Sequence, residues 1–120
     1  MVSVPFTPAA SMPSWPLDDF DDDAFHQLSN SIVDFINEKR FDEASAACEQ
    51  LRIEYPDLID WLDRSAMLHE ARGELALACD FYRRALAYTE SPDQRDYFDE
   101  PGRDYYRTTI AKLESQLLSP

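Results

Sequence analysis

The chain carries one pair of side chains, Cys48 and His69, that could act as a nucleophile and a general base. A thiol beside an imidazole is an arrangement in which the base activates the nucleophile. The sequence places no group to orient the imidazole, and Cys48 falls on the apolar stripe of a helical pattern. We therefore expect His69 to be a hydrogen-bonded core histidine, Cys48 to be a buried hydrophobic residue, and the chain to have no catalytic activity.

A cluster of aspartates near the N-terminus, at positions 18, 19, 21, 22 and 23, is the one candidate for a metal site. It lacks the glycine and the distal glutamate of an EF-hand loop, so Ca²⁺ would be held loosely at most. Cys48 and Cys79 do not have the spacing of a metal or redox motif. With two glycines, the chain has no glycine-rich phosphate loop. The sequence indicates neither a metal nor a cofactor.

The balance of acidic and basic side chains limits the classes of partner that the chain could bind. There are 24 acidic and 11 basic side chains, for a formal net charge of -13. That balance argues against direct binding to nucleic acid, which needs clustered Lys and Arg. No apolar run is long enough to cross a membrane, and the N-terminus lacks the positive region of a secretory signal. We expect a cytoplasmic protein with a protein partner.

Residues 1–23 form an N-terminal segment rich in proline and aspartate, and we expect it to be a flexible tail. Its aspartates allow two interpretations. They could complement the positive end of the first helix. Alternatively, Trp15, Leu17 and Phe20, set among the acids, could form a docking motif for a partner. The two are compatible, and Trp15 could also fold back onto the helices.

From residue 24 to 118, apolar residues recur at intervals of three and four, which predicts an all-α domain. The expected helices span 24–38, 42 to just before Pro56, 57–72 with Asp57 as its cap, 74–88 and 103–118. Residues 93–100 form a short helix or a loop, and Pro101-Gly102 is expected to be a break. The final helix has one apolar face, which suits it to cover the end of a helical stack.

A register of 34 positions links the middle helices. It aligns Phe41 with Leu75, Ala44 with Ala78, Cys48 with Tyr82, and Leu51 with Ala85. A self-similarity of this period is typical of a helix–turn–helix solenoid unit.

These residues resemble two degenerate tetratricopeptide repeats, at about 25–56 and 57–90, followed by a capping helix at about 103–118. Gly73, Ala78, Tyr82 and Ala85 match the motif of that family in the second unit, and Pro56 stands where the proline ending the first unit belongs. The first unit departs from the motif at three positions, which are Lys39 for the glycine, Cys48 for the aromatic residue and Leu51 for the small residue.

The resemblance implies an antiparallel helix-pair solenoid that binds proteins along the first helix of each repeat. That surface would contain His26, Ser29, Val33, Ile36, Asn37, Asp60, Asp63, Met67, Glu70 and Ala71. The clamp that binds a terminal carboxylate in chaperone-docking members is absent, because Ser29 and Val33 stand at two of its positions. The acidic second half predicts a basic or amphipathic ligand. Tyr97, Phe98 and Tyr105 are further candidate contacts, since aromatic residues are enriched at interfaces.

We therefore expect a non-catalytic adaptor, and we retain one alternative of another class. An acidic charge mimic could occupy the nucleic-acid groove of a basic partner. Two repeats are fewer than such stacks usually need. The C-terminal helix, the N-terminal tail or association into a homo-oligomer could supply the missing cover.

Overall fold

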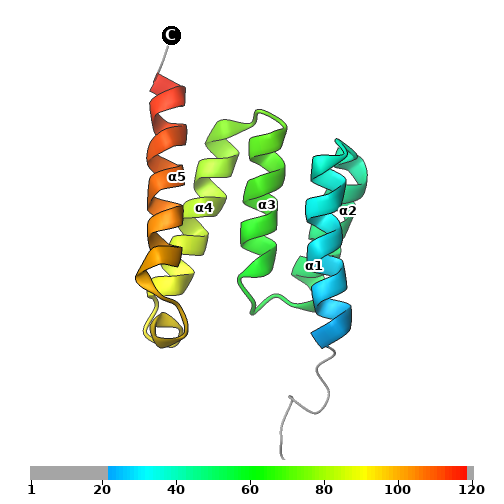
Figure 1. Ribbon diagram of the computed structural model, residues 1–120, viewed down its shortest axis with the longest axis horizontal. Helices are drawn as coiled ribbons and strands as arrows, with labels where there is room; N and C mark the ends of the chain where they lie inside the picture. Colours follow the sequence, from blue (N-terminus) through cyan, green and yellow to red (C-terminus); the bar gives the residue numbers. More distant parts are fainter. Residues whose placement is uncertain (1–21, 119–120) are drawn as a thin grey trace, which may run out of the picture.

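The computed structural model describes residues 22–118, which fold into five α-helices and a short 3₁₀ turn (Figure 1). The helices are α1 (Asp22–Asn37), α2 (Phe41–Glu54), α3 (Asp60–Ala71), α4 (Leu75–Glu90) and α5 (Glu100–Leu118), and the turn is η2 (Arg95–Tyr97). The expected all-α class is confirmed for this part of the chain. Of the expected tail, residues 1–21 lie outside the described residues, whereas Asp22 and Asp23 form the first turn of α1.

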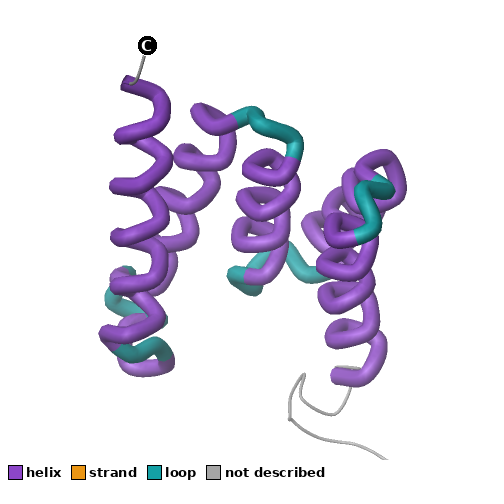
Figure 2. The backbone as a smooth tube through the Cα atoms, turned by 45° about the horizontal axis from the view of Figure 1, so that its top comes forward, coloured by secondary structure: helices purple, strands orange, loops and turns teal. Residues whose placement is uncertain are grey.

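The helices form two antiparallel pairs that lie side by side, with α5 along the outer side of α4 (Figures 1 and 2). α3 contacts both α1 and α2, and so joins the two pairs. α5 packs against α4 and reaches α3 through two long side chains, Tyr106 and Lys112. None of the described helices has the length and apolar character that a bilayer span requires.

The turns within the two pairs have the same backbone conformation. Lys39 and Gly73, 34 positions apart, both take the left-handed conformation, with φ values of 60° and 78°. The next residues, Arg40 and Glu74, have φ and ψ of -91° and 69°, and of -89° and 70°. Each donates its backbone N–H to the carbonyl five residues earlier, at 2.8 and 2.9 Å. The 34-residue register is therefore present in the backbone as well as in the sequence.

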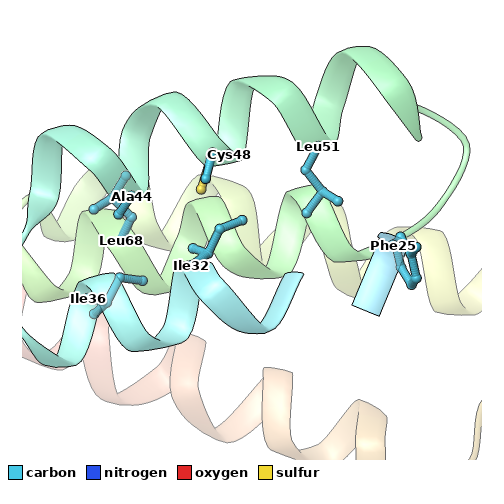
Figure 3. Packing of buried hydrophobic residues seen from close by; sticks show 8 residues of the cluster. Phe25, Ile32, Ile36, Ala44, Cys48, Leu51 and Leu68 are labelled. Carbon is cyan, nitrogen blue, oxygen red and sulfur yellow. The ribbon is translucent and has the colours of Figure 1, made fainter. Parts of the chain in front are cut away.

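The first core cluster closes α1 against α2 and is aliphatic for the most part (Figure 3). Its buried members are Phe25, Ile32, Ile36, Ala44, Ala47, Cys48, Leu51 and Leu68. Ala44 is wholly buried, and its small side chain allows the two helices to approach closely. The recurrence of apolar residues expected for these two helices is confirmed.

The second core cluster joins α3, α4 and α5 around one large ring. It consists of Ala66, Ala78, Cys79, Tyr82, Ile110 and Leu113. Tyr82 has no exposed surface, and its ring lies 6.1 Å from that of Tyr106 on α5. The last helix thus covers the end of the second pair.

The starts of two helices differ from the sequence-based expectation by three residues, and the other helix boundaries by two at most. Pro101-Gly102 does not break the chain, because α5 begins at Glu100 and runs through both residues. Proline needs no N–H partner in the first turn of a helix, and Asp99 Oδ1 accepts the N–H of Gly102 at 3.0 Å. Asp57 does not cap α3, which begins at Asp60, so residues 57–59 are turn rather than helix.

The connector between α4 and α5 is held by a buried arginine. The guanidinium of Arg103 donates to the carbonyl of Thr89 at 2.9 Å and to that of Arg95 at 2.6 Å. It also pairs with Glu100 at 2.9 Å. These bonds fix where α5 starts relative to the end of α4.

Candidate functional site

A cavity of about 940 Å³ is bordered by α2, α3 and α4, and we call it the α2–α4 groove. It is lined by Asp42, Ser45, Ala46, Cys48, Glu49 and Arg52 of α2, by Trp61, Ser65, Leu68, His69 and Arg72 of α3, and by Phe81 and Arg84 of α4. The volume is within the range of ligand-binding clefts. Two of these residues, Cys48 and Leu68, belong to the first core cluster, so the floor of the groove is continuous with the core.

Aromatic rings make up much of the wall formed by α3 and α4. Trp61 lies edge-on to Phe81, with ring centroids 6.3 Å apart. The imidazole of His69 stacks on Phe81 at 5.3 Å with an interplanar angle of 10°. A hydrogen bond also holds Trp61 in place, because its indole N–H donates to the carbonyl of Pro56 at 3.1 Å. The rings are thus positioned before any ligand arrives.

Arg84 gives this wall a positive charge. Its guanidinium lies over the rings of Trp61 and Phe81, 5.2 and 5.0 Å from their centroids. Such a cation–π contact orients the guanidinium without neutralising it. Among residues 22–118, no carboxylate pairs with Arg84, whereas Arg52 pairs with Glu49 and Arg72 lies 3.5 Å from Glu74. An uncompensated cation in so acidic a chain marks a place where a ligand's negative charge is favoured.

The candidate nucleophile and base both line this groove, but their environments are those of structural groups. Burial raises the pKa of the Cys48 thiol to about 11, so it is neutral near pH 7. The expectation that nothing orients His69 was wrong, because its Nδ1 lies 2.8 Å from Glu74 Oε1 and its ring stacks on Phe81. No hydrogen bond joins Cys48 to His69 in the described structure. Oriented as it is, His69 is a hydrogen-bonded, half-buried residue.

The carboxylates expected on the partner-binding surface are already engaged within the molecule. Ser29 Oγ donates to Asp60 at 2.7 Å, and Arg64 pairs with Asp63 at 2.6 Å. The bond from Ser29 joins α1 to α3, and both contacts reduce the charge available to a ligand.

Two tyrosines add to this internal network. The hydroxyl of Tyr82 donates to Glu70 at 2.8 Å, and that of Tyr106 donates to Asp63 at 3.0 Å. Burial raises the pKa of both hydroxyls, with the neighbouring carboxylates adding to the effect, so each remains a donor. Lys112 pairs with Glu70 at 3.2 Å. The acids of α3 therefore anchor α4 and α5.

The other residues predicted to contact a partner lie apart from one another, and some of them are buried. Two of the residues expected on the surface of α1, Ser29 and Ile36, are buried, so they cannot contact a partner directly. His26, Asn37 and Ala71 are exposed, and Val33 and Met67 are half-buried. Tyr97 and Tyr105 are exposed, whereas Phe98 is half-buried against Tyr88. Trp15 and Phe20 lie outside the described residues. The structure does not bring these side chains into one site.

Reasoning from the sequence missed the residues that define the groove, above all Trp61, Phe81 and Arg84. A signal was present in the 34-residue register. Ser45, Glu49 and Arg52 on α2 align with Cys79, Arg83 and Leu86 on α4. A helix surface that is polar in one unit and partly apolar in the other indicates that only one of the two is covered.

No group of three or more His, Cys, Asp or Glu side chains in the described part of the chain could hold a metal ion. No known family model, curated protein or solved structure matches this chain.

Proposed function

We propose that this chain is a non-catalytic protein-interaction module, built from two tetratricopeptide-like helix pairs and a capping helix. Support for the repeat comes from the matching turns at Lys39 and Gly73 and from the 34-residue register. Short helical stacks of this kind present extended surfaces to other proteins. The two free, buried thiols suit a reducing cytoplasmic setting.

The observation that carries this function is the α2–α4 groove, with Arg84 stacked on Trp61 and Phe81. Tryptophan and arginine are among the residue types most enriched where protein interfaces gain their binding energy. The rings are fixed by their own contacts, so binding would cost little ordering of the site. A groove of this composition suits an amphipathic protein segment.

A selection experiment with a blocked groove tests this function. Random peptides displayed on phage would be selected against the whole chain, then tested against an Ala46→Trp variant and an Ala76→Trp variant. Both alanines are exposed, but only Ala46 lines the groove. We expect the selected peptides to bind the Ala76→Trp variant and to lose affinity for the Ala46→Trp variant. Binders that ignore both substitutions, or a selection without binders, would contradict the proposal.

The acidic charge mimic remains a second candidate because many carboxylates face solvent without a partner. Asp34, Asp80, Asp93 and Asp96 are exposed and form no ion pair with another described residue. Salt separates the two candidates. The affinity of a mimic for a basic partner falls steeply with ionic strength, whereas a ligand held mainly by the rings of the groove loses less.

A further inference from the structure

We propose that the α2–α4 groove receives one amphipathic helix of a partner protein, seated on α2 as α5 is seated on α4, with a carboxylate of that helix on Arg84. This inference rests on the proposed function and specifies its ligand. It follows from how the same helix surface is used in the two halves of the molecule.

On α4, this surface is in contact with α5. Cys79 Sγ lies 4.0 Å from the carbonyl of Ile110, and Arg83 forms an ion pair with Glu114. Leu86, one turn further along α4, packs against the same core cluster. α4 thus contacts α5 through Cys79 and Arg83, which lie one turn apart on the same face.

On α2, the equivalent surface is open. The residues 34 positions earlier are Ser45, Glu49 and Arg52, and all three line the groove. The helix that follows α2 does not cover them, because only residues 55–59 separate α2 from α3, whereas residues 91–99 separate α4 from α5. The short connector sets α3 against Ala44 and Leu51 of the core instead. The surface of α2 that lines the groove is therefore equivalent to the surface of α4 that contacts α5, but no described helix covers it.

The chemistry of the groove describes the occupant. Trp61, Leu68 and Phe81 offer apolar surface, which requires an apolar stripe along the incoming helix. In α5, that stripe is Tyr106, Ile110 and Leu113, spaced by four and three. A stripe of the same spacing suits the groove.

The charge of the occupant follows from Arg84. Its guanidinium has no carboxylate partner within residues 22–118, and its planar fork matches a carboxylate, the anionic group that unmodified protein side chains supply. The lining contains three arginines, Arg52, Arg72 and Arg84, against two carboxylates, Asp42 and Glu49. Because Glu49 is paired with Arg52, a basic helix would add its cations to an excess of arginines. The occupant is consequently an acidic amphipathic helix.

Synthetic helices provide the test with the full chain. The probe is a fluorescein-labelled alanine-based helix with Leu at positions i, i+4 and i+7 and Glu beside the stripe. Two matched probes carry Lys in place of Glu, or Pro in the middle of the Glu sequence to prevent helix formation. Fluorescence anisotropy measures binding to the unchanged chain and to Arg84→Gln and Arg84→Lys variants. Arg84 is exposed, so its replacement leaves the core intact.

We expect the Glu helix to bind, with a loss of about tenfold in Arg84→Gln, the effect of removing one charge-assisted hydrogen bond. The Arg84→Lys variant should recover part of the loss, because it restores charge without the planar fork. Equal binding of the Lys helix or of the Pro-containing probe would overturn the proposal. So would a Glu helix that binds Arg84→Gln unchanged, or one that does not bind at all.

One other occupant is distinguishable in the same assay. The chain's own Asp18, Asp19 and Asp21 lie near Trp15 and Phe20 in sequence, and could supply acidic and aromatic groups. Replacement of these three aspartates by Asn should leave the affinity of the Glu helix unchanged, as should replacement of Asp34, Asp93 and Asp96. A large gain confined to the first variant would assign the groove to the chain itself and overturn a partner helix.

The failure of this inference differs from failure of the proposed function. If peptides selected by phage display need an open groove but are basic or not helical, the interaction module stands and the acidic helix is wrong. If no selected peptide depends on the groove, the module itself is contradicted.

Discussion

The two helix pairs of this molecule share a backbone but use it differently, and Cys48 and Tyr82 show how. Each is the eighth residue of its helix, α2 or α4, and they are 34 positions apart. Tyr82 is fully buried, and its hydroxyl reaches Glu70. Cys48 is also buried, but its small side chain forms part of the floor of the α2–α4 groove.

This contrast teaches that a repeated backbone does not imply a repeated surface. Around Tyr82, a large ring and the helix α5 close the space beside α4. Around Cys48, a smaller side chain and a shorter connector leave the corresponding space beside α2 open. The binding surface thus lies where the first pair departs from the pattern of the second.

The largest expected effect is the loss of the Tyr82 ring. We expect Tyr82→Ala to lower the free energy of unfolding by about 3–5 kcal/mol, since it removes a buried aromatic side chain and leaves a cavity. Cys48→Ala should cost only about 1 kcal/mol, in proportion to the few atoms removed. Urea denaturation monitored by circular dichroism measures both. Equal losses at the two positions would show that they are not distinct in packing.

A smaller effect is expected when the aromatic residue is copied into the first pair. Cys48→Tyr should place a ring against the groove floor, lower the free energy of unfolding by about 1–3 kcal/mol through overpacking, and abolish binding of the acidic probe helix. Cys48→Ala is the control, because it keeps the groove open and should keep the affinity. If the Cys48→Tyr variant bound the probe normally, position 48 would not be part of the binding site.

Exchanging the residues of the two left-handed turns tests the shared backbone. A residue with a side chain is strained in this conformation by about 1–2 kcal/mol. Glycine avoids that strain, but it loses more conformational entropy on folding, which offsets part of the gain. We expect Lys39→Gly to raise the free energy of unfolding by at most about 1 kcal/mol, and Gly73→Ala to lower it by a similar amount. A Cβ at Gly73 would meet no atom within 4 Å, so the change reports backbone strain alone. Shifts of the same sign in thermal denaturation would contradict the common conformation.

The smallest expected effect concerns acid. The hydrogen bond from His69 lowers the pKa of Glu74 from its ordinary value of 4.5. A carboxyl whose pKa is lowered by folding stabilises the fold at every pH above the pKa that it has in the unfolded chain. This contribution is lost as the pH falls through the pKa of the folded state. The pKa of Glu43 is lowered in the same way by Arg40.

We therefore expect Glu74→Gln and Glu43→Gln each to reduce slightly the loss of stability below about pH 4.5. Urea midpoints measured across that range compare the two. Both side chains are partly exposed, so an effect confined to one of them would show that the two turns differ in their electrostatics.

Much of the fold was predictable because its signals are local. The apolar stripes at Ile32 and Leu51, the left-handed glycine at Gly73 and the alanine contacts at Ala44 and Ala78 depend on neighbours within a few turns of one helix. The start of α5 was not predicted, since Pro101 reads as a break unless Asp99 is known to cap the helix.

The candidate site was less predictable. The acids Asp60, Asp63 and Glu70 looked free in the sequence, and their partners Ser29, Tyr106 and Tyr82 belong to other helices. No local pattern shows that a tyrosine on α5 will reach an aspartate on α3.

The sequence by itself therefore determined the helical class, the 34-residue register and the residues that face each core, because periodicity and turn chemistry act over short distances. The tertiary structure alone decided which helix surfaces are covered. That choice depends on connector length and on where the guanidinium of Arg103 fixes α5 against α4. It leaves Ser45, Glu49 and Arg52 on an open wall, whereas two of their counterparts on α4, Cys79 and Arg83, contact α5.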